Sequence, residues 1–309
     1  MNHSGGESTK TSDFNYRSRY PRLKGVDQQL SIILTQMSLR TLRPDDYTVG
    51  WVSALPVELA AATEFLDEEH KELPQDDDDN NLYTLGSIGK HNVVIACLPA
   101  GQTGTNSATT VAMQMKRTFH SIRFGLMVGI GGGVPSDKVD IRLGDVVVSQ
   151  PFAEYGGVIQ YDLGKSTPSG FIQTGFLSPP PRLLLNALAK VQALSLRGKY
   201  HFQSHLSKID HIPEFRRDHA GPDILFESTY NHIGGSSCET CDREKLKKRM
   251  QKGRENSMAH YGIIASSNQV MKDGTTRDNV SSKLGGVLCF EMEAAGLMND
   301  FPCLVIRGM

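Results

Sequence analysis

Apolar runs and amphipathic segments alternate along most of this chain, and the alternation predicts an α/β fold. The apolar runs are short and rich in Val and Ile, as is typical of buried strands. They lie at 47–54, 82–88, 92–98, 123–128 and 145–149, and residues 157–161 look like part of a hairpin. Segments with helical spacing of apolar residues predict helices at 55–66, at about 105–119, and from the prolines at 179–181 to about 196. Strands and helices in alternation indicate a mixed, largely parallel sheet.

Two stretches lack this pattern. Residues 1–46 are polar and serine-rich, so we expect a flexible tail in front of a single domain over 47–309. Apolar residues at helical spacing between Val26 and Met37 leave open a short amphipathic helix within that tail. The stretch from about 204 to 258 is only weakly periodic. Because long loops inside a domain are uncommon unless they are functional or disordered, we expect an irregular surface insertion there.

Composition narrows the classes of function. The chain has 309 residues, of which 39% are hydrophobic and 22% charged, and its net charge is −1. This balance is typical of a globular protein and gives no electrostatic argument for nucleic acid or an anionic membrane as a partner. The sequence has no apolar stretch near the ~20 residues of a membrane span and no apolar segment typical of a secretory signal. Five cysteines in so long a chain do not make a disulfide scaffold, and we predict a cytoplasmic protein.

Candidate site residues gather where predicted strands end. Four segments have this position, at 54–58, 99–105, 129–133 and 266–271. The acidic run Glu291–Glu293 opens another apolar segment near the end of the chain. Since open α/β sheets bind their ligands at the carboxyl ends of strands, we expect these segments to share one site.

The order and spacing of these segments resemble the nucleoside phosphorylase/nucleosidase superfamily. The likeness rests on the run CFEMEAAGLMNDFPCLVIR, from Cys289 to Arg307, and on the glycine-rich run Gly129, Ile130, Gly131, Gly132 and Gly133. It is closest to the variant found in fungal multidomain proteins. The resemblance implies a three-layer fold with a mixed central sheet flanked by helices. It also implies a homo-oligomer without a cofactor that cleaves the N-glycosidic bond of a purine nucleoside or nucleotide.

The resemblance assigns roles to the acidic run and to the segment at 266–271. Glu293 matches the carboxylate that binds the ribose hydroxyls, and Met292 would pack on the sugar, whereas Glu291 is a less specific neighbour that could bind backbone instead. Val270 and Met271 would stack on the base, with Asn268 making a polar contact. The alternatives are acidic residues at a helix N-terminus for the first group and an ordinary strand end for the second.

The nucleophile separates two reactions. Phosphorylases of the superfamily hold phosphate with an arginine and a serine flanking the glycine turn, where this chain has Met127 and Ile130. The hydrolytic branch has a glutamate after the first strand that activates water, and Glu58 matches it. We therefore expect hydrolysis with Glu58 as the general base. A phosphate-dependent phosphorylase is the enzymatic alternative, and for Glu58 itself the alternative is a solvated helix residue.

The resemblance also bears on the last residues of the sequence. In relatives a catalytic aspartate follows four residues after the arginine that matches Arg307, and a terminal helix covers the sheet; both positions lie beyond Met309. We expect this exact chain to lack that helix and to be a poor catalyst, because loss of a general acid forfeits about 10²–10⁴ in rate. A non-catalytic nucleoside-binding or interaction module is the alternative from a different class.

The predicted insertion contains a pair of cysteines, Cys238 and Cys241, with His232 and Asp242 nearby. The spacing is half that of a structural zinc site, and no second ligand pair is evident. We favour solvent-exposed thiols in a loop and assign no metal, which leaves this pair as a weak zinc candidate. Three further cysteines, Cys97, Cys289 and Cys303, lie in apolar strand contexts typical of a buried core.

Overall fold

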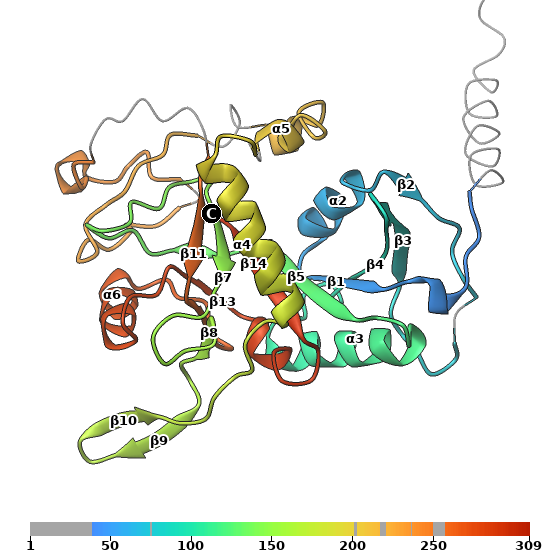
Figure 1. The fold of residues 1–309 in the computed structure, drawn as a ribbon. Coiled ribbons are helices and arrows are strands. Elements are labelled where there is room, and N and C mark those ends of the chain that lie inside the picture. The colour runs from blue at the N-terminus through green and yellow to red at the C-terminus, as the bar shows by residue number, and fades with distance from the viewer. Residues whose placement is uncertain (1–38, 75, 201–202, 217–220, 236, 250–256) are drawn as a thin grey trace, which may run out of the picture. The chain divides into compact units, whose positions relative to one another are not determined.

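The fold is given by a computed structural model, shown in Figure 1, that describes residues 39–74, 76–200, 203–216, 221–235, 237–249 and 257–309. The chain divides into two units, residues 1–40 and 41–309, and the second holds every element discussed below. Most of the predicted tail, including the helical spacing between Val26 and Met37, lies outside the described residues. Packed structure begins before the expected boundary at 47, because Leu42 packs against the core and a 3-10 turn, η1, spans Pro44–Asp46.

An eight-stranded mixed sheet forms the centre of the 41–309 unit, in the order β11-β7-β14-β5-β1-β4-β3-β2. Its strands are β1 (Val49–Ser53), β2 (Glu68–Glu69), β3 (Tyr83–Ile88), β4 (His91–Cys97), β5 (Phe124–Ile130), β7 (Val146–Ser149), β11 (Ala259–Gly262) and β14 (Cys303–Gly308). The four middle strands β14, β5, β1 and β4 are mutually parallel. Their carboxyl ends therefore meet at one edge, as the sequence predicted.

Helices cover both faces of this sheet, which gives the predicted three layers. On one face, α2 (Pro56–Glu64) and α4 (Arg182–Leu196) pack against clusters that share Phe124 and Leu126 of β5. On the other face lies α3 (Thr105–Thr118), which was expected at about 105–119 and which buries Ala108, Val111, Ala112 and Met115. Figure 1 shows α2 and α3 on opposite sides of β1 and β4. The predicted α/β fold class is confirmed.

A second, four-stranded sheet packs beside the first, in the order β6-β13-β12-β8. It consists of β6 (Gly132–Gly133), β8 (Val158–Gln160), β12 (Ile264–Ser266) and β13 (Cys289–Glu291), and α6 (Gly274–Lys283) packs against it through Val280. The hairpin expected at 157–161 is wrong, because β8 pairs in parallel with β12. Both Val158 and Ile159 are buried, so this strand lies between two apolar clusters. The hairpin lies just beyond, between β9 (Gly164–Thr167) and β10 (Gly170–Gln173).

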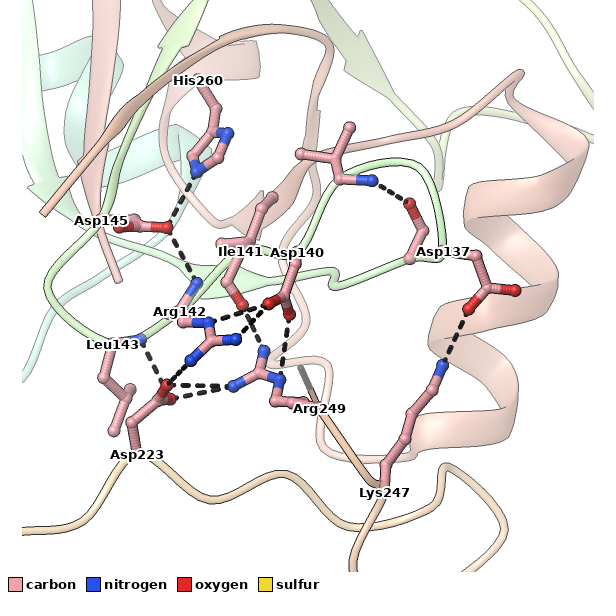
Figure 2. A network of polar contacts seen from close by, with 12 residues as sticks. Asp137, Asp140, Ile141, Arg142, Leu143, Asp145, Asp223, Lys247, Arg249 and His260 are labelled. Atoms are coloured by element: carbon pink, nitrogen blue, oxygen red, sulfur yellow. Dashed lines mark hydrogen bonds and ion pairs between the residues drawn. The ribbon is translucent and has the colours of Figure 1, made fainter. Parts of the chain in front are cut away.

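The predicted insertion at 204–258 is largely irregular where it is described. Its described residues include the short α5 (Gln203–Leu206) and the 3-10 turns η2 (Pro213–Phe215) and η4 (Arg243–Lys245). Charged side chains fasten it to the loop before β7, as Figure 2 shows. Arg249 pairs with Asp223 within the insertion and with Asp140 outside it, at 3.0 Å in each case. Because the Arg249 side chain is only 12% exposed, these ion pairs are screened less than surface pairs.

Asp145, just before β7, connects the end of the insertion to the central sheet. Its carboxylate accepts hydrogen bonds from the backbone N–H of Met258 at 2.9 Å and from that of Arg142 at 3.0 Å. His260 on β11 contacts the same carboxylate at 2.8 Å (Figure 2). The described part of the chain contains no helix with the length and apolar character of a membrane span.

Candidate functional site

A cavity of about 460 Å³ opens at the carboxyl ends of β1 and β5, next to the end of β13. Its lining comes from segments that lie far apart in the sequence and that were predicted to converge. Among the lining residues are the carboxylates Glu58, Glu291 and Glu293, together with Ile130, Gly131 and Gly132 of the glycine-rich run. The two glutamates to which the resemblance assigns chemistry, Glu58 and Glu293, thus line the same cavity.

Glu58 is fixed by three backbone N–H groups. Pro56 starts α2, where its missing N–H costs no hydrogen bond, and this places Glu58 in the first turn. Its Oε2 accepts from the N–H of Ala54 at 2.6 Å and from that of Leu55 at 2.9 Å. Its Oε1 accepts from the N–H of Ile130 at 2.7 Å, across the site. Glu58 is buried, so its interpretation as a solvated helix residue is wrong.

Glu291 is bound to backbone and to a buried arginine. Its Oε2 accepts hydrogen bonds from the N–H of Glu293 at 3.1 Å and from the N–H of Ala294 at 3.0 Å. In this way it satisfies donors at the start of η5 (Ala294–Gly296), as a capping side chain does. The same oxygen accepts from Nη2 of Arg307. Glu291 therefore fixes the turn that carries Glu293, in agreement with the alternative that it binds backbone.

Glu293 is held more loosely. Its Oε1 accepts from the N–H of Gly104 and its Oε2 from Nη2 of Arg307, each at the long distance of 3.3 Å. Burial raises the pKa of its carboxyl above the usual range; Glu291 and Glu58 act in the same direction, while Arg307 and the Gly104 N–H oppose them. Both oxygens thus keep capacity for a further hydrogen-bond donor.

Arg307 is the residue whose importance sequence analysis missed. It is fully buried on β14 and binds both Glu291 and Glu293. Burial by itself lowers the pKa of a guanidinium, but Glu291, Glu293 and Glu58 together hold the pKa of Arg307 above its usual value. An arginine inside the apolar run Cys303–Arg307 was the available signal, because a buried cation needs a buried carboxylate partner.

The glycine-rich run continues a strand and starts another, so it is more than a loop. β5 extends through Ile130, and Gly132 and Gly133 form β6, which pairs with β13. Gly129 does not line the cavity but lies behind it, where an added Cβ would stand 2.5 Å from both Oε1 of Glu58 and Nη1 of Arg307. Gly133 also lies outside the lining, near Ile141 and Met309.

The residues proposed to hold the base are only partly brought together. Val270 and Met271 line the cavity, and Val270 is 62% exposed; Met292, which the resemblance assigns to the sugar, lines it too. Asn268 does not line it. Its Oδ1 accepts hydrogen bonds from the N–H of Thr105 at 2.9 Å and from its hydroxyl at 3.0 Å, at the start of α3. The polar contact expected of Asn268 is therefore used within the protein, and the neighbouring Gln269 lines the cavity instead.

The cysteine pair of the insertion belongs to a separate cluster. Ligand atoms of His232, Cys238 and Cys241 all lie within 4.8 Å of one another. Cys241 is buried, so the expectation that both thiols are solvent-exposed is wrong. Asp242 is not in this cluster; its Oδ1 accepts from the N–H of Glu244 at 2.9 Å. None of these residues lines the cavity that Glu58 and Glu293 share.

Gly129 offers a test of this site geometry. We expect Gly129→Ala to destabilise the protein by about 1–3 kcal/mol, because the new methyl group must displace the carboxylate of Glu58 or the guanidinium of Arg307. Gly132→Ala is the matched control, since its Cβ would meet only the Phe290 carbonyl oxygen at 4.0 Å. Denaturant unfolding of both variants measures the difference. Equal stabilities would contradict the close packing behind the cavity.

No family model matches the chain. A "Nucleotide-binding leucine-rich repeat (NLR)-like protein" of Hyaloscypha variabilis is 48% identical over 272 residues, which make up 87% of this chain and 27% of that protein. The chain therefore spans about a quarter of the length of that relative.

Solved structures share the fold at low sequence identity. The 5'-methylthioadenosine/S-adenosylhomocysteine nucleosidase of Neisseria meningitidis, in complex with methylthio-immucillin-A, has a TM-score of 0.52 at 13% identity, covering 84% of each chain. The corresponding nucleosidase of Streptococcus pneumoniae, with 8-aminoadenine, has a TM-score of 0.50 at 17% identity, covering 85% of this chain and 84% of that one. The futalosine hydrolase of Helicobacter pylori gives 0.51 and 17%, covering 85% and 83%. The chain therefore has the same α/β fold as these nucleosidases and this hydrolase.

Proposed function

We propose that the cavity binds a purine nucleoside or nucleotide and that water cleaves its N-glycosidic bond there. The observation that carries the proposal is the placement of Glu58 and Glu293 in the lining of one cavity. Cleavage of this bond builds positive charge on the ribose, needs a nucleophile at the anomeric carbon, and requires that the departing base gain a proton. One carboxylate can meet each of the first two needs, provided that the sugar lies between them. The proton that the base takes up is balanced by the proton that the attacking water loses.

Glu293 is suited to bind the ribose and to stabilise positive charge on it. Its two long hydrogen bonds leave acceptor capacity for ribose hydroxyls, and it is largely removed from water. A fixed anion in a water-poor cavity stabilises a developing cation more strongly than the same anion would in solvent. Glu58 and Glu291 add negative charge nearby, and Arg307 balances only part of it.

Glu58 is placed to activate the water molecule that acts as nucleophile. An ionised carboxylate has roughly four acceptor positions, and backbone N–H groups take three of them in Glu58. One position is then left for a water molecule, which the fixed carboxylate can orient and deprotonate.

The same lining argues against phosphate as the nucleophile. None of the described residues around the cavity is a lysine or an arginine. Ile130 presents an apolar side chain where a phosphate-binding hydroxyl would be needed, and Met127 is fully buried. A phosphate dianion would thus enter a cavity that already holds carboxylates, without a cation to balance it.

The walls of the cavity suit a purine base. Val270, Met271 and Met292 provide apolar surface, and Gln269 provides one amide for a polar contact. Polarisable methionine side chains pack well against aromatic rings. The solved neighbours with methylthio-immucillin-A and with 8-aminoadenine support a purine ligand for this chain as well. Assembly into a homo-oligomer stays a prediction.

One observation favours a second candidate function, nucleoside binding without turnover. The relative in Hyaloscypha variabilis is far longer than this chain, so the same domain there is part of a larger protein. In such a protein a bound nucleoside could act as a signal and need not be a substrate.

Glu58→Gln separates the two functions. We expect the purified chain to release free base from adenosine, inosine or methylthioadenosine in phosphate-free buffer, at the low rate that the sequence predicts for a poor catalyst. The Gln side chain cannot accept a proton from water, so the variant should lose about 10²–10⁴ in rate while still binding nucleoside. The measurement is base release by chromatography, beside calorimetric binding of the same nucleosides.

The control is Glu64→Gln on the same helix, because Glu64 is exposed. It should keep the wild-type rate. Release that requires added phosphate and yields ribose 1-phosphate would contradict hydrolysis. Nucleoside binding by the wild-type chain without any release would contradict catalysis and favour the second candidate function.

The pH dependence of binding tests the role of Glu293. The pKa of Glu293 is raised above that of an ordinary glutamate, which is about 4.3. As pH falls, Glu293 therefore becomes protonated at a higher pH than an ordinary glutamate does. Ribose hydroxyls donate to the ionised carboxylate, and nucleoside affinity should therefore fall through that raised pKa. Calorimetric titrations over a pH series measure it. Glu293→Gln should bind more weakly at neutral pH without this decline, and an unchanged acid decline in the variant would assign the titration to another group.

A further inference from the structure

A loop in the insertion, residues 228–244, is closed at its base; we name it the cysteine loop. The strand-like ends on either side pair with each other, with Phe226 opposite Leu246 in an antiparallel bridge. Backbone hydrogen bonds join Glu227 N–H to the Lys245 carbonyl at 2.9 Å and Lys247 N–H to the Leu225 carbonyl at 2.8 Å. These backbone contacts hold the two ends of the cysteine loop together whatever side chains lie within the loop.

Side chains that follow the cysteine loop in the sequence bind the insertion to the rest of the domain. Arg249 reaches Asp140 in the loop before β7, and Lys247 reaches Asp137 at 3.4 Å (Figure 2). The rings of Phe226 and Tyr230 stack with centroids 5.3 Å apart, and the Tyr230 hydroxyl accepts from the N–H of Asp242 at 2.9 Å. These contacts hold both ends of the cysteine loop but do not reach its middle.

The middle of the cysteine loop has little apolar material to hold it together. Gly234 and Gly235 have φ values of 106° and 91°, and Ile233, its one large aliphatic residue, is 62% exposed. Even so, Cys241 is only 4% exposed. A polar loop that buries one of its two thiols without a hydrophobic core has the character of segments that a bound metal orders.

The three potential ligands converge at this place. Ligand atoms of His232, Cys238 and Cys241 all lie within 4.8 Å of one another, close enough for one ion to contact all three. The cysteines form a Cys-x-x-Cys turn in which the N–H of Cys241 donates to the Cys238 carbonyl at 3.3 Å. This is the spacing that zinc knuckles use, and the histidine completes a two-sulfur, one-nitrogen set.

We propose that the cysteine loop binds a zinc ion through His232, Cys238 and Cys241. Two thiolates and a neutral imidazole balance the charge of Zn²⁺, and their soft sulfur ligands select zinc over magnesium or calcium. The thiols give up their protons on binding. Three protein ligands leave one position of the tetrahedron to water or to another group.

The surroundings of His232 suit this role. Its Nε2 contacts the Ser237 carbonyl at 3.1 Å, and its Nδ1 accepts from the N–H of Gly234 at 3.2 Å. Metal binding through one nitrogen replaces one of these contacts, and the other keeps the ring oriented, as outer partners of metal-bound histidines generally do. The zinc ion orders the insertion and takes no part in the proposed cleavage, since its ligands do not line the cavity.

Metal content tests the proposal. After reconstitution under reducing conditions and removal of free metal, the wild-type chain should hold about one zinc ion by elemental analysis. Cys241→Ser and His232→Ala should each lose most of it. The matched controls are Cys97→Ser and His211→Ala, a thiol and an imidazole outside the cluster, which should keep the wild-type content.

Cobalt binding by the unaltered chain keeps the test decisive if a variant fails to fold. Co²⁺ bound through two thiolates should give intense sulfur-to-metal absorption in the near ultraviolet, which zinc should then remove. A reduced wild-type chain that takes up neither metal would overturn the proposal. So would zinc content unchanged in a folded Cys238→Ser/Cys241→Ser variant. None of these readouts depends on nucleoside cleavage.

Discussion

The guanidinium of Arg307, buried at the end of β14, is the charge around which the candidate site is arranged. It binds Glu291 and Glu293 directly, and it lies near Glu58 in the space that a side chain at position 129 would fill. A charge removed from water is tolerated only when it is paired and hydrogen-bonded, and removing one partner of such a group costs about 3–5 kcal/mol. The turn at 291–293, the first turn of α2 and strand β5 are therefore held in one arrangement by shared electrostatics. That arrangement gives the cavity its shape.

The three carboxylates around Arg307 have different roles. Glu291 makes four structural contacts, because the Ala294 N–H approaches both of its oxygens while the Glu293 N–H and Arg307 bind Oε2. Glu58 is fixed by backbone yet keeps one acceptor position, and Glu293 has only long contacts. Identical side chains thus differ in what they can offer a ligand, and the cause is how many donors the fold already supplies to each. The proposed chemistry follows from this difference.

Much of the fold and of the candidate site could be predicted from the sequence, because apolar spacing and short motifs are local features of the chain. The strands and helices followed from apolar spacing within each segment, and the order of motifs predicted that Glu58, Glu293 and the glycine-rich run would meet. What escaped prediction depended on partners far along the chain. The parallel pairing of β8 with β12 and the engagement of Asn268 with Thr105 are set by tertiary packing. In the insertion, the sequence placed both His232 and Asp242 near the cysteine pair, but only the path of the loop brings His232 and not Asp242 into the cluster.

A crystal structure of this chain with adenosine bound tests the central claim most directly, because it needs no turnover. The account predicts that the ribose hydroxyls lie within hydrogen-bond distance of the Glu293 carboxylate. It also predicts that the anomeric carbon faces Glu58, with a water molecule between them, and that the base lies against Val270 and Met271. Adenosine bound elsewhere, or bound in this cavity with its ribose turned away from both glutamates, would contradict the account.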